Sequence, residues 1–260
     1  MPNEKAARGG AQARRLKLVV AYDGRDFSGW QLQPNSDTIQ ARLEAAFASV
    51  TGDEIRVHGA GRTDAGVHAL GQCAHADLIT RLDPAVLLSA LNASLPASIR
   101  VMRCRFVAKS FHARFDARGK VYRYRIVTTP VLSPFELGRA WHVTGALDEA
   151  ALRACTLQFL GRHNFAGFAA NRGHPVESTM RTIRQARLHH TGGAIAIEFE
   201  GDGFLYKMMR LMVGAIVRCA LGRTSLGEVR ERLRHPVAAS IERHRLVAPA
   251  EGLTLIRVQY

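Results

Sequence analysis

The chain has 260 residues, of which 36 are Lys or Arg and 22 are Asp or Glu, so its formal net charge is +14. A composition that is 47% hydrophobic and 22% charged is that of an ordinary globular protein with a core of its own. There is no uninterrupted run of about 18 apolar residues and no apolar segment within residues 1–15, which argues against a membrane span and a secretory signal.

The first half of the chain predicts strands alternating with helices. Residues 1–15, rich in Ala, Gly, Arg and Gln, are expected to form a flexible basic arm. Asp37 is expected to cap a helix that ends at Gly52, and Asp83-Pro84 opens a second helix with proline at its first position. Apolar, β-branched runs bounded by turn residues predict strands at 16–22, 55–58, 71–78 and 99–107.

The second half repeats this scheme. Asp148 is expected to cap one helix, Ser225 another through a capping box, and the long apolar run 204–221 predicts a third that Gly222 ends. Gly192-Gly193 is a two-residue hairpin signal. Strands are expected at 121–127, 183–191, 194–200 and 253–260.

Mixed strands and helices with a hairpin favour an α+β fold. We expect two similar α/β subdomains, 16–109 and 110–260, each with a mostly antiparallel sheet flanked by helices. No linker rich in Pro or Ser marks the boundary near residues 107–111, so the two halves are expected to pack closely, with a basic RNA-binding cleft between them.

Positive charge gathers between residues 100 and 125, which hold nine basic residues and a single acid, Asp116. Five aromatic side chains interleave with them. Basic groups bind phosphates and aromatic faces stack on unpaired bases, so the pattern indicates RNA binding. The alternative is a half-buried strand pair with a solvated basic face, and both interpretations can hold together.

No metal site is expected. The four cysteines are widely spaced, without a CxxC pair, and His58, His68, His75 and His112 show no ligand spacing. Unpaired cysteines of this kind fit a reduced, cytoplasmic protein.

The loop 59–71 holds four glycines around one carboxylate, Asp64, with Arg62 close by. It lacks the Gly-Lys-Ser/Thr of a phosphate-binding loop, and Asp64 stands where a dinucleotide fingerprint needs glycine. An ionised carboxylate serves as a nucleophile or stabilises positive charge, and a nearby arginine favours its charged form. The alternative is an aspartate that only closes an Asx turn.

Nine consecutive residues, Gly61–Ala69, closely resemble the motif of the TruA-type tRNA pseudouridine synthases. Order and spacing agree from about Leu16 to Tyr260, and the departures at Met209 and Leu211-Met212 are small. Further matching segments are Tyr22–Gly24, Phe27–Gln31, Asn92–Pro96, Phe111–Phe115, Tyr122–Tyr124, Phe204–Gly214 and Glu251–Leu253.

The resemblance implies an isomerase that converts uridine to pseudouridine at positions 38, 39 and 40 in the anticodon arm of tRNA, without cofactor or metal. Asp64 matches the essential aspartate, and Arg62 the residue thought to displace the target base. Tyr122 matches a tyrosine that stacks on the uracil and is a candidate base for the C5 proton. Arg210 matches an arginine paired with the aspartate.

The same resemblance implies contacts with RNA from Phe111, His112, Ala113, Arg114 and Phe115, and more weakly from Arg172. It gives His68 no chemical role, and it implies a homodimer with the tRNA spanning both subunits. Two alternatives remain open: a non-catalytic RNA-binding protein, and a pseudouridine synthase with a different RNA target. A nucleotide-dependent enzyme conflicts with the loop sequence.

Overall fold

Ten strands form one sheet in the computed structural model, which describes residues 12–170, 176–191, 193–235 and 247–260. Two lie off the main path: β2 (Val57–Gly59) pairs with β3, and β6 (Trp141–His142) pairs with β5. In order across the sheet, the others are β4 (Ile99–Val107), β1 (Arg14–Tyr22), β3 (His68–Leu78), β10 (Leu253–Gln259), β5 (Gly119–Val127), β9 (Ala194–Gly201), β8 (Met180–Thr191) and β7 (Gly161–Asn164).

Most pairings between these strands are antiparallel, and the parallel ones in the described residues are β3 with β10 and β5 with β6. The predicted α+β class is therefore confirmed. The predicted hairpin is also confirmed, because β8 and β9 pair antiparallel up to Thr191 and Ala194.

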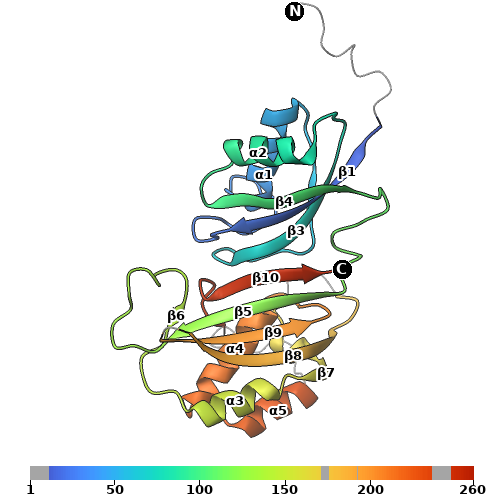
Figure 1. Cartoon of the computed structure of the whole chain (residues 1–260). Helices are drawn as coiled ribbons and strands as arrows, with labels where there is room; N and C mark the ends of the chain where they lie inside the picture. Colours follow the sequence, from blue (N-terminus) through green and yellow to red (C-terminus); the bar gives the residue numbers. More distant parts are fainter. Residues whose placement is uncertain (1–11, 171–175, 192, 236–246) are drawn as a thin grey trace, which may run out of the picture.

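The helices divide between the two parts of the sheet (Figure 1). They are α1 (Ile39–Thr51), α2 (Pro84–Ser94), α3 (Glu149–Leu157), the short 3-10 helix η2 (Phe165–Phe168), α4 (Met208–Ala220) and α5 (Leu226–Arg234). α1 and α2 accompany β1, β3 and β4, whereas α3, α4 and α5 accompany the later strands. None of the helices in the described ranges has the length and apolar character needed to cross a membrane.

Each described helix except α4 begins with a side-chain cap, and one of the expected caps is misplaced. The expected cap at Asp37 is wrong: Thr38 is the N-cap, and its hydroxyl accepts the backbone N–H of Ala41. The Asp37 carboxylate instead binds Arg42, with 2.6 Å between Oδ2 and Nη2. Either residue type can cap a helix, so the sequence did not decide between neighbours. The caps expected at Asp83, Asp148 and Ser225 are confirmed.

Several element boundaries differ from expectation, among them the starts of α4, β3 and β1. α4 begins at Met208 rather than at 204, because Lys207 adopts a left-handed conformation with φ of 57° and turns the chain into the helix. β3 begins at His68 rather than at 71, since His68 and Ala69 pair with β10. β1 begins at Arg14, so the last two residues of the expected arm belong to the sheet.

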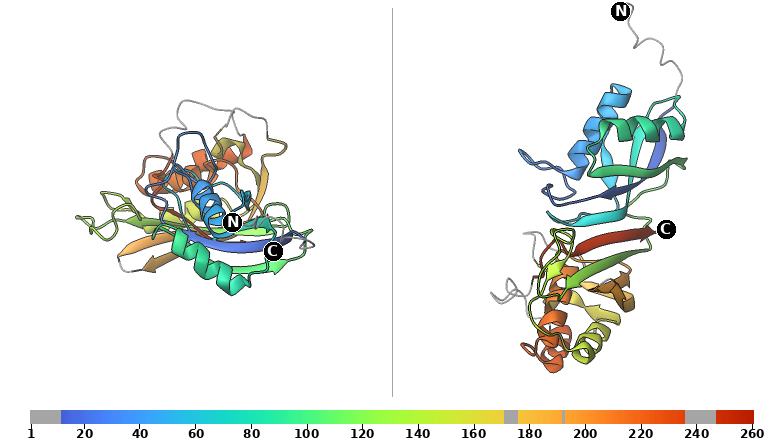
Figure 2. Two further views of the ribbon diagram at one scale, coloured as in Figure 1. Left: turned by 90° about the horizontal axis from the view of Figure 1, so that it is seen from above. Right: turned by 60° about the vertical axis from the view of Figure 1, so that its left-hand side comes forward.

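β10 joins the two halves. Thr254 and Leu255 run parallel to His68 and Ala69 of β3, and the other edge of β10 pairs antiparallel with β5. β2 lies on the same edge of β3 as β10 but farther along, opposite residues 74–76. The right-hand view of Figure 2 shows the same succession of strands, with β10 between the upper and lower groups.

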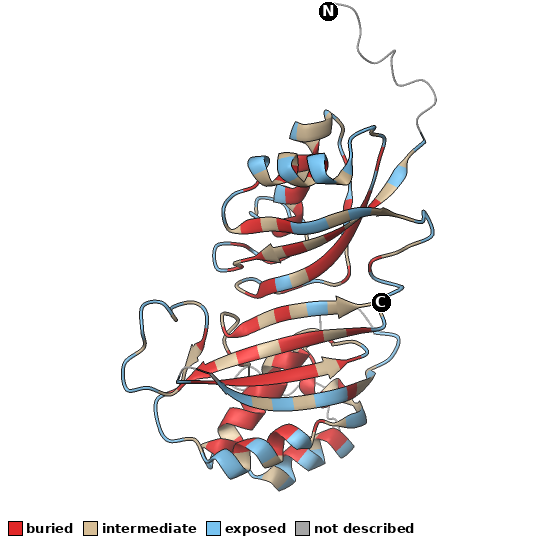
Figure 3. Ribbon diagram, in the orientation of Figure 1, coloured by how far each residue is buried: buried red, intermediate tan, exposed pale blue. Residues whose placement is uncertain are grey.

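Burial follows this arrangement (Figure 3). α4 is the central helix of the second half, and 11 of its 13 residues are buried. β9 is buried along nearly its whole length, whereas β8 beside it is largely exposed. An arginine in α4 is therefore held in a mainly apolar environment, where a charge needs a partner.

Gly24 packs directly on the chain that leads from the Asp64 loop into β3. A Cβ placed on Gly24 would lie 2.0 Å from the carbonyl oxygen of Val67. We predict that Gly24→Ala lowers the free energy of unfolding by about 1–3 kcal/mol, because backbone must move to admit the methyl group.

Gly227 provides the matched control for that substitution. It lies in the first turn of α5, where the nearest atom to an added Cβ is the Ser225 hydroxyl at 3.6 Å. Gly227→Ala is expected to leave stability unchanged or raise it by up to about 1 kcal/mol. Urea unfolding of both variants tests this, and equal effects would contradict the assigned packing.

Candidate functional site

A cavity of about 890 Å³ lies where the two halves of the sheet meet. The first half contributes the loop from Gly59 to Asp64, which leaves β2. The second half contributes Tyr122 of β5 and the segment 204–210, which leads into α4. All four residues expected to carry chemistry therefore line one cavity: Arg62, Asp64, Tyr122 and Arg210.

The loop that carries Asp64 is fixed to the first half by short polar contacts. The Thr63 hydroxyl lies 2.8 Å from the phenol oxygen of Tyr22, and the Thr63 carbonyl accepts the backbone N–H of Trp30 at 3.1 Å. Gln72 donates to the carbonyl of Gly61 at 2.9 Å. Gly29 has φ of 94°, and a Cβ there would lie 2.6 Å from the Thr63 oxygen. The position of the carboxylate is thus set by the backbone on both sides of it.

Asp64 and Arg210 form an ion pair between the two halves. Nη1 of Arg210 lies 3.3 Å from Oδ2 of Asp64, and the side chains are only 15% and 17% exposed, respectively. Nε of Arg210 donates to the carbonyl of Ala248 at 2.7 Å. Two nitrogens of one guanidinium therefore hold the loop, α4 and the chain before β10 in one arrangement.

Tyr122 points into the cavity from β5 and is 8% exposed. Its ring meets Phe204 edge to face, with 5.0 Å between centroids. Burial raises the pKa of the Tyr122 phenol, and Tyr22 and the charge of Asp64 raise it further. The phenol therefore keeps its proton at neutral pH, which favours hydrogen-bond donation over a role as proton acceptor.

Arg62 stands at the exposed edge of the cavity, where its Nε donates to the side-chain oxygen of Gln31 at 3.0 Å. The hydrogen bond of Arg62 therefore goes to Gln31, whereas the ion pair of Asp64 is with Arg210. Proximity in sequence therefore did not make it the partner of the carboxylate.

The segment 111–115 divides into anchors and cavity residues. Phe111 packs against Tyr260, with 5.1 Å between ring centroids, and Ala113 is fully buried. The backbone N–H of Ala113 donates to Nδ1 of His75 at 3.2 Å. These two residues hold the segment on the sheet and do not line the cavity.

His112, Arg114 and Phe115 do line the cavity, and Phe115 is 73% exposed. The rings of His112 and Phe115 lie 4.2 Å apart between centroids. Arg172, the remaining expected contact, lies outside the described residues. The exposed ring beside a cavity is the arrangement expected of a stacking surface.

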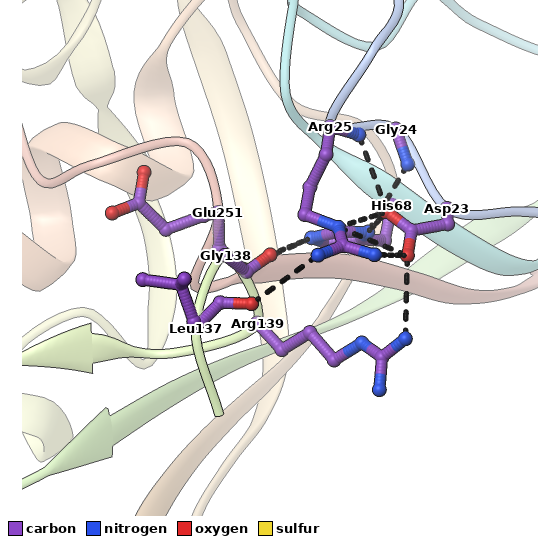
Figure 4. Close-up of polar contacts among 8 residues, drawn as sticks. All are labelled: Asp23, Gly24, Arg25, His68, Leu137, Gly138, Arg139 and Glu251. Atoms are coloured by element: carbon purple, nitrogen blue, oxygen red, sulfur yellow. Dashed lines mark hydrogen bonds and ion pairs between the residues drawn. The ribbon is translucent and has the colours of Figure 1, made fainter. Parts of the chain in front are cut away.

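His68 connects the halves through contacts that the sequence did not reveal (Figure 4). Its Nε2 lies 3.0 Å from the carbonyl of Gly138 and 3.1 Å from that of Glu251, and its Nδ1 accepts the backbone N–H of Gly24 at 3.1 Å. Carbonyls only accept, so a proton on Nε2 fits these two partners, and Nδ1 also lies 3.3 Å from Oδ1 of Asp23.

Asp23 completes this network. Its carboxylate binds Arg25 of the first half at 2.8 Å and Arg139 of the second half at 3.5 Å (Figure 4). Burial opposes ionisation of Asp23, but the hydrogen bonds from Arg25 outweigh it and hold the pKa of Asp23 below its usual value. His68, four residues beyond Asp64 in the same motif, therefore serves to join the two halves.

Comparison with known proteins gives the family. A family model described as tRNA pseudouridine synthase matches residues 18–116 and 156–260. This chain belongs to the tRNA pseudouridine synthase family. It is 44% identical over 253 residues to the tRNA pseudouridine synthase A of Akkermansia muciniphila, covering 95% of each chain. It is 40% identical over 247 residues to the enzyme of the same name from Brevibacillus brevis, covering 95% of this chain and 100% of that one.

A solved structure titled Crystal Structure of a Cbf5-Nop10-Gar1 Complex aligns with 93% of this chain and 56% of its own, at 10% identity and a TM-score of 0.30. That likeness is too weak to carry an argument.

In this member of the tRNA pseudouridine synthase family, the cavity also contains basic residues outside the expected site: Lys120, which belongs to the basic run 100–125, and Arg56, Arg181 and Lys207. Lys120 could have been found, because it lies two residues before Tyr122 on the same strand and therefore on the same face. No group of three or more His, Cys, Asp or Glu side chains in the described part of the chain is arranged to hold a metal ion.

Arg210 uses two nitrogens for two partners, and a lysine has only one. We predict that Arg210→Lys lowers the free energy of unfolding by roughly 1–3 kcal/mol, since one buried acceptor loses its donor. Arg230→Lys is the control: Arg230 is exposed, and its Nε donates to the side-chain oxygen of Gln158 at 2.8 Å. Urea unfolding should separate the two variants, and equal losses would argue against the two-point contact.

His75 predicts an acid-sensitive fold. Burial lowers its pKa to about 4, and the charges of Arg15, His112 and His58 add to the shift. The unfolded chain binds this proton near the ordinary pKa of 6.5, whereas the folded chain does not. Stability is therefore unaffected above about pH 6.5 and falls as the pH drops from 6.5 towards 4.

His75→Asn keeps an acceptor for the Ala113 N–H and removes this titration. Between pH 7.5 and 5, its free energy of unfolding should fall less than that of the wild type. His189→Asn, at an exposed position, should follow the wild type. If the free energy of unfolding falls equally with pH in the wild type and in His75→Asn, His75 does not cause the loss of stability in acid.

Proposed function

We propose that this chain isomerises uridine to pseudouridine at positions 38, 39 and 40 in the anticodon stem-loop of tRNA. The observation that carries the proposal is the Asp64–Arg210 ion pair at the bottom of a cavity made by both halves. A carboxylate held this way stays ionised and oriented while a substrate base moves beside it.

The reaction breaks the bond between N1 of uracil and C1′ of ribose, turns the uracil, and joins C5 to C1′. The proton leaves C5 and N1 gains one, so no electrons are exchanged. In our proposal Asp64 attacks C1′ or C6, or assists elimination to a glycal. Arg210 keeps the carboxylate in place in each of these routes, because its other nitrogen is bound to the backbone of Ala248.

Tyr122 and Phe204 supply the walls for the uracil. Their edge-to-face contact leaves the Tyr122 ring in the cavity, where it can stack on a base. Because the phenol is protonated, we assign it hydrogen-bond donation to the turning uracil rather than removal of the C5 proton. Arg62, at the opening, is placed to fill the space that the extruded base leaves in the RNA.

Phe115 is the proposed stacking surface for an unpaired base of the loop, with His112 behind it. Arg114 and Arg172 are the proposed contacts to the backbone, and Phe111 and Ala113 act by holding their segment. A basic cleft between subdomains 16–109 and 110–260 fits the balance of charge in the cavity, where Asp64 faces seven basic side chains among the described residues.

We further propose that the protein acts in the cytoplasm as a homodimer, with one tRNA spanning both subunits. Support comes from the family resemblance and from exposed apolar side chains on the loop between β5 and β6, where Val131 and Phe135 are 80% and 84% exposed. Exposed apolar groups of this kind mark contact surfaces more often than isolated residues do. Light scattering of the purified protein, with and without tRNA, tests the dimer.

The decisive experiment compares the wild type with Asp64→Asn on uridine-containing tRNA transcripts, mapping pseudouridine by carbodiimide primer extension. We expect the wild type to mark positions 38, 39 and 40, and Asp64→Asn to bind tRNA but mark none. Asp26→Asn is the matched control, since Asp26 is exposed and lies outside the cavity.

Other outcomes decide between the remaining hypotheses. Pseudouridine only at other uridines would indicate a synthase with a different RNA target. Binding without any pseudouridine in the wild type would favour a non-catalytic RNA-binding protein. Activity in Asp64→Asn equal to that of Asp26→Asn would remove Asp64 from the reaction.

A further inference from the structure

Basic side chains outnumber acidic ones in the cavity, and some of them already have partners. Among described residues, Arg56 pairs with Glu44, Arg62 bonds to Gln31, and Arg210 pairs with Asp64. Lys120 differs from these three: no carboxylate or hydrogen-bond acceptor for its ammonium group is found in the described part of the chain. Lys120 is therefore a cavity cation that no acceptor in the described residues compensates.

The position of Lys120 is set by β5. It lies two residues before Tyr122, opposite Val258 of β10 and Gly201 of β9. Its Nζ comes within 2.9 Å of where a Cβ on Gly61 would be, so the ammonium lies over the backbone three residues before Asp64. Gly61 thus leaves room for the lysine head beside the reaction centre.

Two more cations face the same place. Arg114 and Arg181 both line the cavity, and their charges act on Lys120. Burial first of all, and then the charges of these two arginines, lower the pKa of Lys120 to about 8. A desolvated cation among other cations is unfavourable, and an anion that entered would offset the cost.

We propose that Lys120, Arg114 and Arg181 form a binding site for one phosphodiester of the substrate RNA, next to the uridine held at Asp64. The inference rests on the proposed function and adds a contact to it. A phosphodiester fits because it is compact, carries a full negative charge and accepts bonds from several donors at once. It also comes with every nucleotide, so the site would fix the position of the backbone without reading a base.

The site accounts for how the target sugar is held. Asp64 must approach ribose without repelling the phosphates attached to it, and uncompensated repulsion would work against binding. A cluster of cations whose Lys120 lies over Gly61, three residues before Asp64, neutralises one phosphate where the carboxylate acts. Lys120 is in this view a positioning residue that touches the RNA backbone.

The test uses anticodon stem-loop RNAs with a single neutral methylphosphonate at each linkage flanking the target uridine in turn. Binding is measured to Asp64→Asn and to Asp64→Asn carrying Lys120→Met, so the readout needs no turnover. We expect one methylphosphonate to weaken binding to Asp64→Asn about tenfold, or about 1.4 kcal/mol. In the protein that also carries Lys120→Met, a methylphosphonate at the same linkage should hardly weaken binding, because the contact it would remove is already absent.

Controls separate this contact from general charge. Lys109→Met removes the same charge at an exposed position outside the cavity and should leave every methylphosphonate effect intact. Lys120→Met should also reduce the slope of log affinity against log salt by about 0.7–0.9, and Lys120→Arg should restore both the slope and the sensitive linkage. If Lys120→Met does not fold, Lys120→Gln takes its place in the same comparison.

The proposal is overturned if every linkage costs the Lys120 variants as much as their parent. It is also overturned if Lys120→Met binds RNA normally with an unchanged salt slope but loses turnover, since that would assign Lys120 to proton transfer. Failure of the wild type to form pseudouridine would reject the proposed function alone, because the binding comparison would still report on the phosphate site.

Discussion

Everything at the candidate site depends on the place of β10 in the sheet. This strand pairs with β3 on one side and β5 on the other, and the parallel pairing with β3 covers only Thr254 and Leu255. Because the contact is so short, β2 can occupy the rest of the same edge of β3. The Asp64 loop leaves β2 at this division and meets the second half there. The cavity is thus a product of strand order.

That arrangement divides the chemistry between two halves of the chain. The first half fixes the carboxylate through Thr63 and its neighbours, and the second half supplies Arg210 and Tyr122. The ion pair exists only where the halves meet, since Arg210 lies in the buried helix α4 and Asp64 in a half-buried loop of the first half. His68 and Asp23 tie the halves together a short distance away, at the other end of the same motif.

Local rules predicted much of the fold, and tertiary contacts account for most of the misses. Capping preferences correctly predicted the N-caps Asp83, Asp148 and Ser225. They could not decide whether Asp37 or Thr38 caps α1. The extension of β3 was missed because it exists only through pairing with a strand far along the chain. The two-residue strand β6 and the four-residue β7 were missed because such short strands have no periodic pattern to detect.

The site was predicted less by physics than by resemblance. Spacing alone left Asp64 open to a turn interpretation, and nothing local brought Arg210 to it. The basic run was partly misleading: Arg100, Arg103 and Arg105 lie on β4, at the end of the sheet order, and do not line the cavity. Charges on an outer strand discourage association with another sheet edge. Of the nine basic residues, only Arg114 and Lys120 reach the cavity.

The central position of β10 also affects when, during folding, the candidate site forms. β1, β3 and β4 all lie within residues 14–107, and β8 and β9 follow each other directly, so pairings inside each lateral group join closer parts of the chain than the pairings of β10 do. The seam between them needs contacts between distant parts of the chain, and such closures are slow. We therefore expect a folding chain to pass through states with much of its sheet formed while Asp64 and Arg210 are still apart.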